Sequence, residues 1–415
     1  MARGGSRLRR LAGTVTSVTA VLFAVALLEE LSSGVPSAGA PDIERSLQLS
    51  HAATAAVLFT VPGLVQLVLD PVVFLLSDRI ARHHLVRAGL AVMAAASLAA
   101  ALAPGPVTLA CALSIWGVAT GAASSYTELT LIDQRPEQRA RTMARWTLLA
   151  LVGDFAAPAV IGGLVALGGG AGSWRTAFAI VGGLLAAWAI ATSLRPFPPP
   201  ATAPADDEPP LWQAVREAVR DRVLIGWLFG VALCNLLDEI LVVFASIHVR
   251  GELGASALGQ SAMVGAFVAG GAIGLVVLDR LLGRHSEHRL VIATGIACAV
   301  AFAAWLAAPT VWLSAVLMAM VGATAAPLYP LASAQAYARC PGRSGVVVVA
   351  GHLFAPLALA LPWLLGAIAD RAGTLAALAL LIAQPVGLVV LALATPRGVT
   401  TADRGSRGSR TGGAP

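Results

Sequence analysis

The sequence predicts an all-α membrane protein in which twelve transmembrane helices form two pseudo-symmetric six-helix bundles. Of its 415 residues, 57% are hydrophobic and only 12% are charged, whereas a soluble domain carries about 25% charged residues. The apolar residues gather in twelve runs, and several motifs recur in the same order in both halves of the chain. Composition therefore indicates a membrane protein, and the recurrence indicates two related halves.

Each apolar run is long enough to be one membrane-spanning helix, which needs roughly 20 residues. Backbone polar groups in lipid must be hydrogen-bonded within their own segment, so we expect every run to be helical. The runs lie at about 13–35, 50–76, 85–103, 106–130, 144–167, 174–195, 222–247, 256–279, 289–307, 310–336, 344–366 and 373–394.

The arginines predict how the chain is oriented. All 28 basic residues are Arg, and only Arg45, Arg175, Arg250 and Arg371 fall in loops on the side away from the termini. Basic residues are enriched in cytoplasmic loops. We therefore expect both termini in the cytoplasm. The high content of Ala, Gly and Arg without Lys is typical of a GC-rich bacterial genome, so we expect the chain in a bacterial inner (plasma) membrane. The net charge of +6 then reflects topology, and no nucleic-acid partner is expected.

A polar break divides the chain into two bundles. We expect an N-terminal six-helix bundle over 1–195 and a C-terminal one over 222–394, joined by a cytoplasmic linker over 196–221. The linker is rich in Pro and acidic residues, and its last part reads as a short amphipathic helix at the membrane surface. The Gly-, Ser- and Arg-rich tail over 395–415 has a composition typical of disorder.

Three motifs recur in both halves. The offsets between the copies are 209, 201 and 198 residues, so they drift by only a few positions. Two parallel six-helix repeats are an architecture of secondary transporters. The paired motifs are Glu29-Glu30 with Asp238-Glu239, Asp78-Arg79 with Asp279-Arg280, and Gly153–Pro158 with Gly351–Pro356.

Several further stretches resemble the major facilitator superfamily of secondary transporters, over roughly residues 11–394. Leu131–Trp146 is similar to the family's loop between helices 4 and 5, and Ser173–Phe178 to the Trp-Arg motif that opens its sixth helix. Gly366–Gly373 matches the signature Gly-x-x-x-Asp-Arg-x-Gly, here in a loop that the charge rule places outside.

The copy of that signature between helices 2 and 3 is degraded, because Phe74 and Ala81 stand where glycines are expected. In the family these residues latch the cytoplasmic ends of the two halves together. The resemblance therefore implies a conformational latch made of Asp78, Arg79, Arg82, Asp279 and Arg280.

The resemblance does not assign a subfamily. Gly153, Pro158 and the Gly162-Gly163 pair fit part of a helix 5 motif associated with exporters, although Ala157 replaces the Gly before Pro. The Arg motif of helix 4 is missing, and Leu113 stands in its place.

Adjacent carboxylates inside apolar helices are costly and mark candidate functional sites. Neighbours on a helix point about 100° apart, so only one acid of Glu29-Glu30 and one of Asp238-Glu239 can face a central pathway. The family lines this pathway with helices 1, 4, 7 and 10. A desolvated carboxylate takes up a proton readily, which suits exchange of a proton for a substrate. The alternative is a protonated acid that fixes contacts between helices.

Other polar residues in the spans extend this candidate site. Asp70 precedes Pro71, which kinks the helix, and either faces the cleft or accepts a hydrogen bond at the kink. Glu128 lies near the cytoplasmic mouth of helix 4. Tyr126 and Tyr329 lie at comparable depths in helices 4 and 10, where they either line the cavity or serve in aromatic packing.

Asp154 and His352 occupy equivalent positions in helices 5 and 11. Histidine titrates near neutral pH, so His352 either couples proton movement or is a neutral core residue bonded to a backbone carbonyl. With the acids named above, these two residues complete the predicted substrate and proton-coupling set.

The sequence also excludes several functions. A chain without Lys cannot contain a nucleotide-binding P-loop, and its four isolated Cys residues show no metal-ligand spacing. There is no nucleophile constellation either, so we expect no enzyme activity, cofactor or metal site. Arg is nearly absent from the spans, which favours a cationic or neutral polar substrate.

We therefore expect a monomeric antiporter in the lipid bilayer that exports a small cationic or amphipathic molecule in exchange for protons, by alternating access. An importer or facilitator of a metabolite or lysolipid is the first alternative. A transport-inactive membrane sensor or scaffold is the second.

Overall fold

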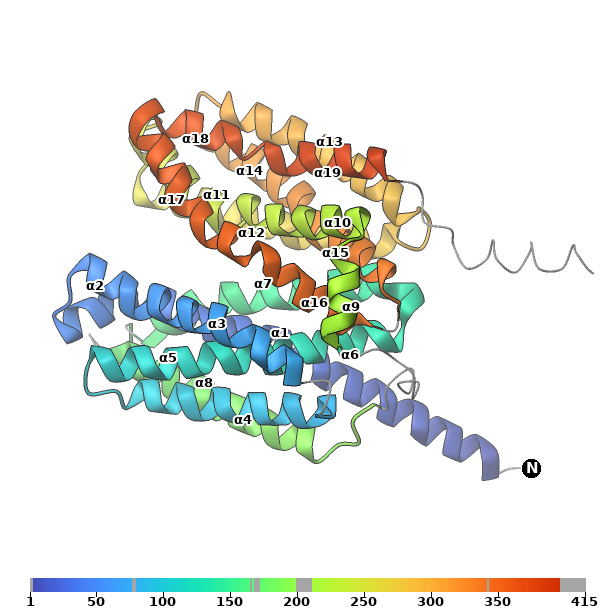
Figure 1. Ribbon diagram of the computed structural model, residues 1–415. Coiled ribbons are helices and arrows are strands. Elements are labelled where there is room, and N and C mark those ends of the chain that lie inside the picture. Colours follow the sequence, from blue (N-terminus) through green and yellow to red (C-terminus); the bar gives the residue numbers. More distant parts are fainter. Residues whose placement is uncertain are drawn as a thin grey trace, which may run out of the picture.

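The chain was analysed as a computed structural model, which describes residues 3–76, 80–164, 166–167, 172–198, 211–341 and 343–395. Within these residues the secondary structure is helical and contains no strand. Figure 1 shows two bundles of roughly parallel helices, one formed by α1 to α8 and the other by α10 to α19. We call the end of the bundles where α1 begins and α19 ends the terminal side.

The N-terminal bundle is made of long helices, two of which contain a π-helical turn. The elements are α1 (Arg3–Leu47), α2 (His51–Ala55), η1 (Ala56–Thr60), α3 (Val61–Leu76), α4 (Arg82–Ala101), α5 (Pro106–Thr120), η2 (Gly121–Ser125), α6 (Tyr126–Gln134), η3 (Pro136–Gln138), α7 (Arg139–Leu164) and α8 (Ser173–Ser193). The π-helical turns are η1 in the second span and η2 in the fourth.

The C-terminal bundle contains more interrupted helices. Its seventh, tenth, eleventh and twelfth spans are each divided into shorter pieces. The elements are α9 (Leu211–Ala218), α10 (Arg222–Leu233), η6 (Cys234–Leu237), α11 (Glu239–Gly251), α12 (Ala257–Leu281), α13 (Glu287–Leu306), α14 (Val311–Ala325), α15 (Leu328–Arg339), α16 (Ser344–Gly351), η7 (His352–Phe354), α17 (Ala355–Ala372), α18 (Thr374–Leu380) and α19 (Ala383–Ala394).

Eleven helical segments among the described residues are long and apolar enough to cross a membrane. The remaining span is helix 7, whose two apolar pieces, Arg222–Leu233 and Ile240–Gly251, are each too short to cross alone. Together they complete the twelve spans, so the predicted fold class is confirmed.

Two predicted boundaries were wrong. Helix 1 continues to Leu47 instead of ending near residue 35, through Pro36 and Pro41. Its extension is held by α8, because Trp174 Nε1 donates a hydrogen bond to Ser46 Oγ at 2.9 Å. The signature at 366–373 is not a loop: its residues up to Ala372 are part of α17, and Gly373, with φ of 89°, ends the helix.

The segment between the bundles ends in a helix, as the sequence predicts. Ala214 of α9 is buried against Val346 of α16, next to Cys340 and Val349. Residues 199–210 of the predicted linker and residues 396–415 of the predicted disordered tail lie outside the described residues.

The two bundles meet on the terminal side. There α7 packs on α12 and α15, and α16 packs on α3 and α6. Because α7 and α16 belong to the fifth and eleventh spans, equivalent helices of the two halves form much of the joint.

Candidate functional site

A cavity of about 280 Å³ lies between the two bundles. Three carboxylates line it, Glu30 and Asp154 from the N-terminal half and Asp238 from the C-terminal half, and no Arg or His is among its described lining residues. The other lining residues are Trp146, Thr147, Ala150, Leu151, Cys234, Leu237, Phe267, Val268, Gly271, Leu275, Ala325, Ala326 and Tyr329. The cavity is therefore acidic, with aromatic and aliphatic walls.

Close packing of α1 on α7 places Glu30 beside Asp154. A Cβ atom on Gly153 would lie 2.4 Å from the carbonyl oxygen of Leu27 and 2.9 Å from the Cβ of Glu30, so only glycine permits this approach. Glu30 Oε2 also accepts a hydrogen bond from Ser33 Oγ at 3.0 Å. Two acids of different helices are thus held at one wall of the cavity.

Glu29 points elsewhere. Its Oε2 accepts a hydrogen bond from Ser124 Oγ, 3.2 Å away in the π-helical turn η2. The carboxyl groups of Glu30, Asp154 and Glu128 lie near that of Glu29. The N-terminal half therefore concentrates four carboxylates around helices 1, 4 and 5.

Asp238 lies at a break in helix 7. Its φ of −130° and ψ of −121° separate η6 from α11. Just before the break, the buried side chain of Gln384 contacts the backbone of helix 7: Leu237 N, at the end of η6, donates to Gln384 Oε1 at 2.7 Å. The side chain of Asp238 is exposed to the cavity, whereas that of Glu239 lies outside the described side chains.

Asp70 is not part of this cavity. It is only 6% exposed, and its Oδ2 lies 3.5 Å from Nε2 of His352 in the other half. The His352 ring lies 5.0 Å from the ring of Phe74, and its Nδ1 lies 2.9 Å from the carbonyl oxygen of Val348. His352 thus contacts a backbone carbonyl, which one of the two interpretations of this residue expected, and also the carboxylate of Asp70, which the sequence did not predict.

Glu128 also contacts the other half, through Tyr337. The buried hydroxyl of Tyr337 on α15 donates to Glu128 Oε1 at 3.0 Å. Tyr329 of the same helix lines the cavity. Tyr126 does not: it is buried, and its hydroxyl donates to the carbonyl oxygen of Phe74 at 3.4 Å.

Two ionic clusters close the terminal side. Arg82 Nη1 and Ser344 Oγ both donate to Asp133 Oδ2 at 2.7 Å, which joins α4, α6 and α16. Asp279 of α12 pairs with Arg141 at 3.3 Å and with Arg145 at 3.1 Å, both on α7. Of the other residues expected in a latch, Arg280 is exposed, and Asp78 and Arg79 lie outside the described residues.

Sequence reasoning missed three residues of this region. Trp146 lines the cavity, Tyr337 binds Glu128, and Gln384 caps the helix break. Gln384 had a detectable signal, since it is an amide within an otherwise apolar run. Among the described residues, no group of three His, Cys, Asp or Glu side chains could hold a metal ion.

The fold is shared with solved transporter structures. The E. coli fucose:proton symporter FucP superposes with a TM-score of 0.72 at 13% identity, covering 90% of this chain and 97% of that chain. The proton:xylose symporter XylE gives 0.68 at 14% identity, covering 92% and 95%. A bacterial homologue of the iron transporter ferroportin, in an outward-facing state, gives 0.69 at 16% identity, covering 91% and 98%.

No curated protein sequence matches the chain. The family model of the Major Facilitator Superfamily matches residues 22–347, which is well over half of the sequence. The protein is therefore a multi-pass membrane protein with the fold of secondary transporters that work by alternating access, and it belongs to the Major Facilitator Superfamily, as its motifs predicted.

Proposed function

We propose that this protein exports a small cationic or amphipathic molecule in exchange for protons. The observation that supports this proposal is the cavity between the halves, whose described lining contains the carboxylates of Glu30, Asp154 and Asp238 and no Arg or His. A cation bound there neutralises carboxylates that are costly to keep charged within a membrane. When the cation leaves, protons neutralise the same groups, so substrate and proton compete for one site.

The walls of the cavity favour an organic cation. Trp146, Phe267 and Tyr329 line the space beside the carboxylates, and aromatic rings attract cations over their faces. The volume of about 280 Å³ is near the lower end of the roughly 300–1,000 Å³ typical of ligand pockets. The substrate is accordingly small.

In alternating access, the contacts between the two halves on the terminal side are the ones that open and close. The contact of Asp133 with Ser344, and those of Asp279 with Arg141 and Arg145, hold the halves together there. These contacts must separate for the site to open on that side, which we assign to the cytoplasm of a bacterial cell from the distribution of arginines. In this proposal one chain in the inner membrane is the transport unit.

Uptake of the fluorescent cation ethidium into inverted membrane vesicles under an imposed pH gradient tests this function. We expect Glu30→Gln and Asp238→Asn to lower gradient-driven uptake at least tenfold, since each removes a cavity carboxylate. Glu217→Gln, at an exposed position of α9, is the matched control and should transport normally. Full coupled transport by the double variant Glu30→Gln/Asp238→Asn would refute the proposal.

Import is the second candidate function, because two of the similar structures are of proteins named as proton symporters. It predicts accumulation in right-side-out vesicles rather than in inverted ones. Flux that follows the substrate gradient alone, with no effect of pH, would instead favour a facilitator of a metabolite or lysolipid.

A further inference from the structure

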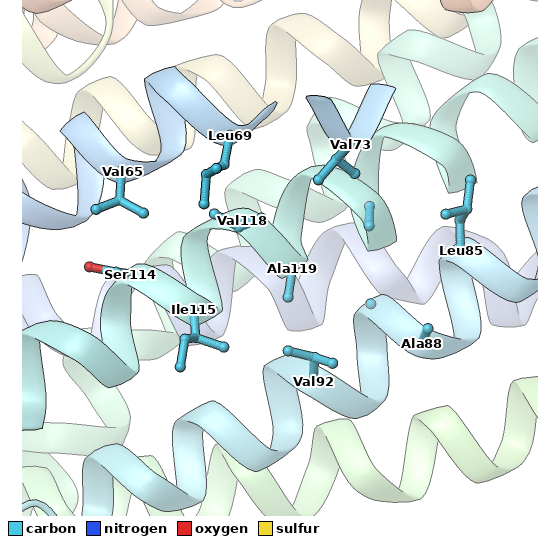
Figure 2. Close-up of a pocket in the computed structure, with 12 residues that line it drawn as sticks. Val65, Leu69, Val73, Leu85, Ala88, Val92, Ser114, Ile115, Val118 and Ala119 are labelled. Atoms are coloured by element: carbon cyan, nitrogen blue, oxygen red, sulfur yellow. The ribbon is translucent and has the colours of Figure 1, made fainter. Parts of the chain in front are cut away.

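A second hollow lies on the outside of the N-terminal bundle. It is a groove of about 350 Å³ between α3, α4 and α5, and it shares no lining residue with the cavity between the halves. Figure 2 shows side chains of all three helices converging on it, with Leu69 and Val73 on α3, Leu85 and Val92 on α4, and Ile115 on α5. Val92 and Ile115 are 41% and 54% exposed, so the groove opens outwards.

The groove offers no polar group to a ligand. Among the described lining residues Ser114 alone is polar, and its hydroxyl already donates to the carbonyl oxygen of Ala110 at 2.7 Å. Burying a polar ligand against such walls would cost free energy without a compensating hydrogen bond. The lining therefore selects a hydrocarbon.

The groove runs along the helices for about the depth of one leaflet. From Val65 to Val73 the α3 wall covers eight helical steps, or about 12 Å at 1.5 Å per residue. Half of a hydrocarbon core of about 30 Å is about 15 Å. The wall lies in the second half of the span Ala53–Phe74, next to the terminal side, and Leu85 lies near the start of the span Arg82–Ala101 on that same side.

The groove exists because side chains separate α3 from the fourth span. A Cβ atom on Gly117 would lie 3.4 Å from Gln66 Oε1, and one on Gly121 would lie 3.0 Å from Asp70 Oδ1. Gln66 and Asp70 thus lie between the helices on the inner side. The neighbouring face of α3, with Val65, Leu69 and Val73, does not contact the fourth span closely and forms one wall of the groove.

We propose that this groove binds one acyl chain of a phospholipid from the leaflet on the terminal side. Its lining is hydrocarbon, its mouth opens to the bilayer and its length matches one leaflet. The bound chain packs on the face of α3 adjacent to Asp70, and so supports the helix whose Asp70 contacts His352 of the other half. This lipid site is independent of the transported substrate.

Photo-crosslinking of the full-length protein tests the site. The protein is reconstituted in phosphatidylethanolamine and phosphatidylglycerol vesicles that contain a trace of phospholipid with a diazirine on one acyl chain. We expect adducts to concentrate on the peptides 65–73, 85–92 and 114–122. A diazirine near the ester should label the end at Val73 and Leu85, and a diazirine at the terminal methyl should label the end at Val65 and Ser114.

A variant that fills the groove provides the specific control. Ala88→Phe places a ring in the groove and should reduce adducts on these peptides at least fivefold, whereas Val300→Phe, on the exposed apolar surface of α13, should not. Val92→Trp fills the same space if Ala88→Phe does not fold. Adducts spread evenly over the exposed apolar surface, or unchanged by filling the groove, would overturn the proposal.

Discussion

Helices 2 and 4 of the first half and helices 8 and 10 of the second half are related by the internal repeat, yet they pack differently. At an offset of 201 residues, Asp70 corresponds to Gly271 and Gly121 to Gly322. A Cβ atom on Gly322 would lie 2.1 Å from the carbonyl oxygen of Phe267, so those two backbones touch. In the first half the carboxylate of Asp70 lies between the helices instead.

This single difference has two consequences. Backbone contact seals helices 8 and 10, as small residues do in membrane helix pairs, while the side chain of Asp70 keeps helices 2 and 4 apart and leaves the outer groove. The same side chain reaches His352 across the joint. In the second half a glycine thus allows helices 8 and 10 to pack in contact. In the first half Asp70 keeps helices 2 and 4 apart and also contacts the second half.

Substituting the related glycines should produce the largest effect. Gly322→Ala forces backbone to move and should lower the free energy of unfolding by about 3 kcal/mol, the upper end of overpacking costs. Gly121→Ala meets only the Asp70 side chain and should cost about 1 kcal/mol. Unfolding in mixed micelles measures both, with Gly63→Ala, which meets nothing within 4 Å, as control. Equal losses at positions 121 and 322 would contradict the comparison.

The acid pairs differ between the halves in a similar way. Helix 1 passes unbroken through Glu29 and Glu30, whereas helix 7 breaks at Asp238 and depends on Gln384 for a hydrogen bond. Gln384→Leu removes the side-chain acceptor of the buried Leu237 N–H group and should lower the free energy of unfolding by about 1.5 kcal/mol. The exposed Gln213→Leu is the control, and a loss no greater than in that control would show that the break does not need Gln384.

Asp70→Asn tests the polar contact between the halves. We expect it to reduce the population closed on the terminal side up to about tenfold, or 1.4 kcal/mol. Spin labels at the exposed positions Arg135 and Arg284, one on each half, report this population as a distance distribution. In a double-mutant cycle with His352→Gln the effects should be non-additive; strict additivity would show that the two residues act independently.

The sequence was sufficient for the twelve spans and the two related halves, because a bilayer leaves an apolar run little alternative to a helix. It was not sufficient where a distant residue decides the local structure. The end of helix 1 depends on Trp174 bonded to Ser46, 128 residues away, and the break in helix 7 depends on Gln384, 147 residues from Leu237. No local pattern encodes either contact.

The candidate site, too, could be predicted only in part from the sequence. Glu30, Asp154, Asp238 and Tyr329 were all singled out from the sequence, and all four line one cavity. Which acid of the first pair lies there is decided by how α1 is rotated against α7, and this rotation is set by the close approach at Gly153. Helical periodicity predicts that Glu29 and Glu30 point in different directions, but it does not predict which of them faces the cavity.

The smallest expected effect concerns the start of helix 7, where a carboxylate caps the helix and pairs with an arginine. Asp221 caps α10: its Oδ1 accepts from the N–H groups of Val223 and Leu224, and its Oδ2 accepts from Arg339 Nη2 at 2.7 Å. Partial burial alone would raise the pKa of Asp221, but the hydrogen bonds from Arg339 and the two N–H groups outweigh it and hold this pKa below its ordinary value.

A depressed carboxylate pKa stabilises the fold above the unfolded value of about 3.9, and this stability is lost as the pH falls through the folded value. Arg339→Gln should lower the free energy of unfolding at pH 7 by only about 0.5 kcal/mol, because the pair is partly exposed to water. Unfolding between pH 7 and pH 3 should show the gap between wild type and Arg339→Gln narrowing at the acidic end, as Asp221 takes up its proton. A gap that stays constant over this range would mean that Arg339 contributes through packing of its side chain, and that the start of helix 7 has no ionic anchor.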